Sequence, residues 1–174
     1  MSLRLLGWAV FVLASPSVAS ADGIRGQGFV FDFHAGAGAL QDETTTPAMM
    51  YGLGFGYALD QAATIALGAE LQGLASWTRD VRRDRAALLA TVTVWLGEHA
   101  SLKLGVGAPV GPAAIGDGFA AFVRGGYELR RWSKTALVIS LDVTEDTTAG
   151  PQVSALIGFD VFTHEQTMNV WHPN

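Results

Sequence analysis

The stretch MMYGLGFGYALD, residues 49–60, alternates large apolar side chains with glycine. The odd positions hold Met49, Tyr51, Leu53, Phe55, Tyr57 and Leu59, and the even positions after Met50 hold Gly52, Gly54, Gly56 and Ala58. This alternation predicts a β-strand with two different faces. Glycine weakens a strand, so three glycines on one face indicate that this face must leave room for neighbouring side chains.

The same period of two recurs along the chain. Strands are expected at residues 29–38, 49–59, 63–77, 88–96, 102–108, 119–129, 137–144 and 152–161. Turns are expected near Asp60, Glu98 and Ser133, and longer loops at residues 41–47, 78–85, 110–117 and 145–151. An even number of segments joined by short connections predicts an all-β fold, an eight-stranded antiparallel up-and-down barrel.

The charged residues of these segments keep to the face that bears the glycines. They are Asp32, Glu70, Lys103, Arg124, Glu128, Asp142 and Asp160. A charge on the other, apolar face would cost roughly 2 to 4 kcal/mol at the middle of a membrane. The pattern therefore predicts a transmembrane barrel with its apolar face toward lipid. A soluble lipocalin-like carrier, whose apolar face points inward, is the alternative.

The ends of the chain differ from this pattern. Arg4 precedes an apolar stretch at residues 5–14, and Ala19-Ser20-Ala21 follows, which is typical of a cleavable signal peptide. We therefore expect a signal peptide at residues 1–21, one barrel domain at 22–162 and a tail at 163–174. Cysteine is absent, so the fold does not depend on disulfides. The net charge of -5 argues against nucleic acid as a partner.

The signal peptide and the eight alternating segments resemble the small eight-stranded outer-membrane β-barrels, such as the transmembrane domain of OmpA and OmpX. The resemblance covers nearly all of residues 28–162. It implies a monomer in the outer membrane of a Gram-negative bacterium, inserted by the barrel-assembly machinery, with lipid and lipopolysaccharide as its surroundings. One departure is the tail after Phe162, where many such barrels end in a terminal aromatic residue.

The glycine-bearing face also predicts the polar contents of the lumen. The expected network is Asp32, His34, Glu70, Gln72, Lys103, Arg124, Glu128, Asp142 and Asp160. In a narrow lumen such a mixture of charges is expected to form an ion-paired plug. The alternative is a narrow channel for ions or small solutes, with a path through Glu70, Arg124, Glu128 and Asp142.

Four arginines in the expected loop 78–85 are candidates for contact with lipopolysaccharide phosphate: Arg79, Arg82, Arg83 and Arg85. The acidic stretches 42–44 and 145–147 are expected to be solvated tips. The pair His99 and Ser101 is similar to the His-x-Ser pair of lipid A deacylases, but its expected place in a turn argues against catalysis. We expect no enzyme activity, no cofactor and no metal site, and a structural, membrane-integrity or surface-contact role.

Overall fold

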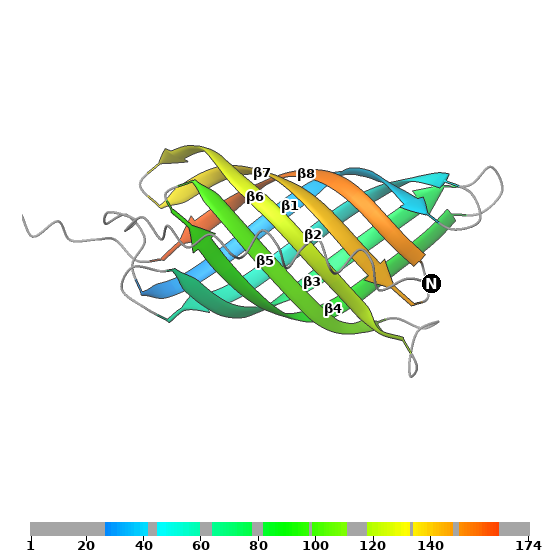
Figure 1. Cartoon of the computed structure of the whole chain (residues 1–174), viewed down its shortest axis with the longest axis horizontal. Coiled ribbons are helices and arrows are strands. Elements are labelled where there is room, and N and C mark those ends of the chain that lie inside the picture. The colour runs from blue at the N-terminus through cyan, green and yellow to red at the C-terminus, as the bar shows by residue number, and fades with distance from the viewer. Residues whose placement is uncertain are drawn as a thin grey trace, which may run out of the picture.

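The computed structural model describes residues 27–41, 45–59, 64–77, 82–97, 99–110, 118–132, 134–147 and 150–163. These residues form eight antiparallel strands that close into one barrel (Figure 1). The strands are β1 (Gly28–Gln41), β2 (Thr45–Ala58), β3 (Ile65–Trp77), β4 (Arg82–Leu96), β5 (Ala100–Val110), β6 (Ala120–Trp132), β7 (Thr135–Asp146) and β8 (Gly150–Phe162). The predicted all-β class and the eight-stranded antiparallel barrel are confirmed.

The barrel closes where the first and last strands pair. β1 and β8 run antiparallel in continuous register from Val30↔Phe162 to Leu40↔Gln152. Thr163 extends this seam by one residue, because its amide donates to the carbonyl of Phe29 at 3.0 Å. A closed sheet has no free edge, so the backbone hydrogen bonds of all eight strands are made within the barrel.

The barrel has two ends, which we call the termini end and the loop end. At the termini end, β1 begins at Gly28 and β8 ends at Phe162, and the loop end lies opposite. The strands cross obliquely between the two ends (Figure 1). At the termini end, Gly97 follows β4 with a φ of +81°, a left-handed conformation that favours glycine.

Several strands are longer than predicted, and the loops at the loop end are correspondingly shorter. β2 begins at Thr45, β4 begins at Arg82, and β7 continues to Asp146. The prediction that residues 78–85 form one loop is therefore wrong, because Arg82, Arg83 and Arg85 belong to β4. The backbone of this hairpin pairs as far as Trp77↔Arg82.

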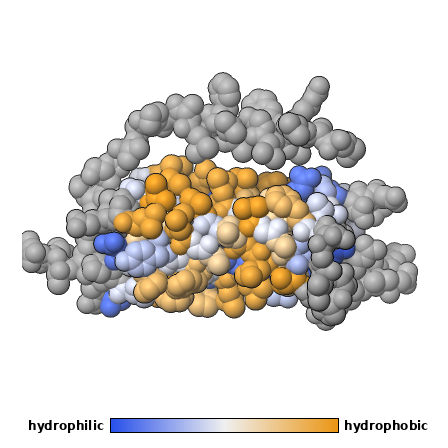
Figure 2. Space-filling view, turned by 90° about the horizontal axis from the view of Figure 1, so that it is seen from below, coloured by the Kyte–Doolittle hydropathy of each residue, from blue (hydrophilic) through white to orange (hydrophobic). Residues whose placement is uncertain are grey.

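The outer wall of the barrel is apolar. The large side chains at the odd positions of the quoted stretch are exposed, from 37% for Tyr57 to 54% for Leu53, whereas Met50, Gly52 and Gly54 are buried on the inner face. Figure 2 shows one face of the barrel, on which apolar residues cover most of the middle and polar residues gather toward both ends. No described residue lies in a helix that is long and apolar enough to cross a membrane.

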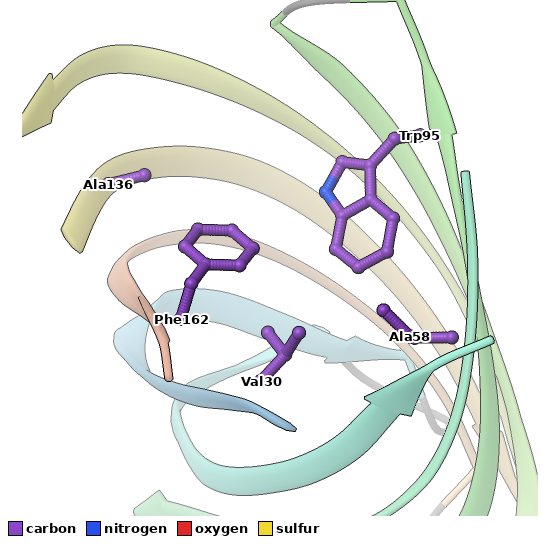
Figure 3. Packing of buried hydrophobic residues seen from close by; sticks show 6 residues of the cluster. Val30, Ala58, Trp95, Ala136 and Phe162 are labelled. Carbon is purple, nitrogen blue, oxygen red and sulfur yellow. The ribbon is translucent and has the colours of Figure 1, made fainter. Parts of the chain in front are cut away.

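The lumen is closed at the termini end by an apolar cluster, called here the apolar floor. Its buried members are Val30, Ala58, Ala66, Trp95, Ala136 and Phe162. The labelled side chains converge from strands on different sides of the lumen (Figure 3). The ring centroids of Trp95 and Phe162 lie 6.3 Å apart. The interior of an eight-stranded barrel is narrow enough for such side chains to fill it.

Candidate functional site: the charged lumen

Above the apolar floor, charged side chains from five strands meet in one group, called here the central charge cluster. Its members are Asp32 and His34 of β1, Glu70 of β3, Lys103 of β5, Arg124 of β6 and Asp142 of β7. The strand register explains the grouping. Asp32, Gly54 and Glu70 are directly paired across β1, β2 and β3, and Lys103, Arg124 and Asp142 across β5, β6 and β7.

Arg124 holds the cluster together. Its two terminal nitrogens donate to the two oxygens of Glu70 at 3.1 and 2.8 Å, and its Nε donates to Asp142 at 2.8 Å. The guanidinium carbon also lies 4.7 Å from the centre of the Phe122 ring. The carboxylates of Glu70 and Asp142 are buried, and a charge in such a place is stable only when it is paired and hydrogen-bonded.

Lys103 connects Glu70 to a third carboxylate of the inner wall, that of Asp32. Its Nζ lies 2.8 Å from Asp32 Oδ2 and 2.6 Å from Glu70 Oε2. The ammonium thus bridges two strands that are separated by β2. Lys103 and Arg124 together surround Glu70, so that both of its oxygens have cationic partners.

His34 lies between the carboxylates and is the one described side chain with a buried polar atom lacking a hydrogen bond. Nδ1 is 3.3 Å from both Asp32 Oδ1 and Arg124, and Nε2 is 3.4 Å from Glu70 without forming a hydrogen bond to it. Asp32, His34 and Glu70 each offer one possible metal-ligand atom within 4.8 Å of the others. However, Lys103 and Arg124 already neutralise these carboxylates at contact distance, which favours an ion-paired cluster over a site for a dication.

The glycines on the inner face make room for this cluster. Gly52 is paired with His34, and a Cβ at Gly52 would lie 2.3 Å from His34 Nε2. Gly54 is paired with Asp32, and a Cβ there would lie 1.8 Å from Asp32 Oδ2. The side chains of His34 and Asp32 therefore lie over the glycines with which they pair on β2. This explains why the quoted stretch is so rich in glycine.

Glu128, which the sequence placed in the same network, lies in a separate ion pair nearer the termini end. It pairs with Arg131 through both carboxylate oxygens. The guanidinium of Arg131 also lies 5.2 Å from the centre of the Phe162 ring in the apolar floor. The sequence analysis did not place Arg131 in the lumen. The register of β6 shifts between Glu128 and Arg130, and after this irregularity the inward and outward positions of the strand are exchanged.

Toward the loop end the lumen holds neutral hydrogen bonds and one more ion pair. Gln72 donates to the sulfur of Met50 at 3.3 Å. Arg85 reaches within 3.9 Å of Asp146, which is buried. The interpretation of residues 145–147 as a solvated tip is therefore wrong for Asp146, and Arg85 is an inward residue of β4. Both lie in parts of strands that were predicted as loops.

Small cavities separate these layers. One of about 50 Å³ lies between the apolar floor and the central charge cluster, and Ser101, Ser140 and Asp160 are among the residues that line it. Another of about 20 Å³ lies toward the loop end beside Gln72 and Arg85. Polar cavities of this size hold a few water molecules at most.

The remaining sequence-based candidates are not brought together. Ser101 lines the lumen, whereas the ring of His99 lies 5.9 Å from that of Tyr127, whose side chain is exposed on the outer wall. The two residues therefore do not form a pair at one site. The expected signal peptide at residues 1–21, residues 42–44, Arg79 and the tail beyond Thr163 lie outside the described residues.

No model of a known protein family matches the sequence, and no curated protein is significantly similar to it.

Proposed function

We propose that this chain is an outer-membrane β-barrel with a plugged lumen, and that its role is structural or lies in surface contact. The observation that carries the proposal is the distribution of charge. Among the residues whose side-chain exposure the structure describes, which leaves out 82–84, the exposed charged side chains are Arg130 near the termini end and Glu145 near the loop end. Between them the outer wall is apolar around the barrel, as a lipid-facing belt must be.

The dimensions of the strands support this assignment. They contain between 11 and 15 residues. At about 3.3 Å per residue and a tilt of about 40°, they extend roughly 28 to 38 Å along the barrel axis. The hydrocarbon core of a bilayer is about 30 Å thick, so such strands are long enough to cross it.

Aromatic residues on the outer wall gather toward the termini end. Phe29 stacks on Phe55 with ring centroids 5.4 Å apart and meets Tyr57 edge-on at 5.1 Å. Tyr127 and Trp132 lie exposed near the same end on β6. The rings of Tyr57, Tyr127 and Trp132 carry a polar atom, and such rings favour the boundary between hydrocarbon and water, so these residues fit one interfacial girdle of the membrane.

The soluble carrier has less support. A carrier needs an apolar cavity inside and polar side chains outside, whereas this lumen holds ion pairs and the apolar side chains face outward. The proposal also includes a signal peptide, localisation in the outer membrane, insertion by the barrel-assembly machinery and a monomeric state. It further includes a likeness to the OmpA and OmpX barrels and the absence of enzymatic activity.

The narrow channel also has less support than the plug. The cavity between the apolar floor and the central charge cluster holds only about 50 Å³, and ion pairs of that cluster lie next to it. Planar-bilayer recording tests this point. We expect no channel events for the wild type or for Glu128→Ala, and regular unit conductances in the wild type would favour the channel.

The proposed location is tested by cell fractionation combined with heat modifiability. We expect the protein in the outer-membrane fraction, extracted only with detergent, with a band that shifts on the gel after boiling. The Glu145→Gln variant, altered only near the loop end, should behave identically. Recovery of folded protein from the periplasmic fraction without detergent would contradict the proposal.

A further inference from the structure

A β-bulge in β6 changes the direction of the side chains near the termini end. The register with β7 shifts between Glu128 and Arg130, which leaves Leu129 as the extra residue. Under strict alternation Arg130 would follow Glu128 into the lumen. Instead Leu129 and Arg130 are both exposed, and Trp132 is exposed as well. A bulge commonly redirects side chains in this way.

The bulge places two consecutive arginines on opposite faces of the sheet. Arg131 turns inward and pairs with both carboxylate oxygens of Glu128. Arg130 turns outward, and its guanidinium carbon lies 5.3 Å from the centre of the Trp132 ring. The face of an indole ring attracts a cation, so Trp132 holds this guanidinium against the outer wall.

The charge of Arg130 is not neutralised by a carboxylate within the part of the chain that the structure describes. Glu128, the carboxylate nearest to it in sequence, faces the lumen and is paired with Arg131. Among the residues whose exposure is described, the one exposed carboxylate is that of Glu145, which lies near the loop end. The outer wall at the termini end therefore carries an exposed cation without a matching anion of its own.

The neighbours of Arg130 indicate the depth at which it lies in the proposed membrane. Tyr127 and Leu129, which precede it, are exposed on the outer wall, and Trp132 is the last residue of β6. Tyrosine and tryptophan rings are enriched where the hydrocarbon gives way to the headgroups. Phosphate oxygens are the acceptors at that depth, and a guanidinium offers them a planar pair of donors.

We propose that Arg130, held by Trp132, binds the phosphate of an anionic glycerophospholipid in the leaflet at the termini end. The inference rests on the proposed function, because a lipid phosphate reaches this level only if the outer wall lies in a membrane. The guanidinium pairs with the phosphate oxygens, and Leu129 contacts the apolar part of the lipid. An anionic lipid is favoured over a zwitterionic one, because the described wall at this end exposes a cation and no carboxylate to receive an ammonium group.

Native mass spectrometry of the folded barrel, released from detergent, tests the proposal. The probes are a phosphatidylglycerol and a phosphatidylcholine with identical acyl chains, each with and without inorganic phosphate in the buffer. Arg130→Gln removes the guanidinium, and Trp132→Leu removes the ring that holds it. Glu145→Gln is the control at the loop end. The double variant Arg130→Gln/Glu145→Gln has the net charge of the wild type but lacks the site.

We expect the wild type and Glu145→Gln to retain phosphatidylglycerol roughly five-fold better than phosphatidylcholine, which is the effect of one basic residue at an anionic lipid surface. Arg130→Gln and the double variant should lose this preference, and Trp132→Leu should lose most of it. An undiminished preference in Arg130→Gln or in Trp132→Leu would overturn the proposal. Its return in the double variant would do the same, because net charge alone would then explain it. Displacement of the lipid by inorganic phosphate would show a site for the ion alone.

The boiling shift and the detergent requirement of the same samples report separately on the proposed function. A folded, detergent-dependent barrel without this lipid preference refutes the site at Arg130 alone. A barrel that is folded in plain buffer refutes the function.

Discussion

The substitution Gly54→Ala tests how the inner face holds the central charge cluster. Gly54 is paired with both Asp32 and Glu70, and Lys103 bridges these two carboxylates across it. A Cβ at Gly54 would lie 1.8 Å from Asp32 Oδ2, well inside the 3.0 Å limit of real contacts. The carboxylate must therefore move by more than 1 Å.

This movement breaks the 2.8 Å contact between Asp32 and Lys103, because Glu70 holds the ammonium from the other side at 2.6 Å. A hydrogen bond between charged groups contributes about 1.5 to 3 kcal/mol. Replacing glycine by alanine in a strand returns about 0.5 to 1 kcal/mol through backbone entropy. We therefore expect Gly54→Ala to lower the free energy of unfolding by about 0.5 to 2.5 kcal/mol in total.

Gly125→Ala is the matched control, because Gly125 lies exposed on β6 and a Cβ there meets nothing within 4 Å. The assay is equilibrium urea unfolding in lipid vesicles, followed by tryptophan fluorescence and by the boiling shift. Gly125→Ala should leave the stability unchanged or raise it slightly. In an Asp32→Ala background the cost of Gly54→Ala should disappear, because no carboxylate remains to be displaced. Equal stability of Gly54→Ala and Gly125→Ala would refute the reasoning.

Three further substitutions test the lumen and the outer wall in the same unfolding assay. Arg124→Met leaves Glu70 and Asp142 without their shared cation and should cost about 3 to 5 kcal/mol, whereas Arg130→Met at the exposed rim should cost less than about 1 kcal/mol. Trp95→Ala opens a void in the apolar floor and should cost about 3 to 5 kcal/mol; an unchanged urea midpoint would show that the floor is not packed. Leu141 is 64% exposed on the outer wall, and Leu141→Arg should make the free energy of insertion into the bilayer less favourable by about 2 to 4 kcal/mol. Insertion of Leu141→Arg equal to that of Glu145→Arg would argue against a lipid-facing belt.

The alternation of residues was enough to predict the fold and, in the quoted stretch, the side of the barrel on which each residue lies. Tyr51 and Leu53 lie outside and Gly52 and Gly54 inside, because a strand has a period of two and a closed sheet separates its faces completely. The residues at which the strands begin and end were harder to predict from the alternation. Arg82 and Arg83 continue β4 although their charge is typical of a loop, since pairing with β3 extends the hairpin.

The partners within the lumen could not be predicted from alternation alone. Which glycine faces His34 or Asp32 depends on the register between strands, and the register is a tertiary property. The shift after Glu128 reverses the alternation of β6 and brings Arg131 inside, where the strict period of two had placed no cation. Arg85 and Asp146 were missed for a different reason, because they lie in strand ends that the sequence interpretation assigned to loops.

The environment of the outer wall is measured most directly by site-directed spin labelling of the barrel in lipid vesicles. Labels are placed at Leu53 on β2 and Ile139 on β7, both exposed on the outer wall, and at Gln41 near the loop end as an aqueous reference. We predict that the labels at Leu53 and Ile139 collide with oxygen dissolved in the hydrocarbon and are protected from a water-soluble nickel complex, whereas the label at Gln41 is not. Equal access of the nickel complex to all three labels would contradict the account.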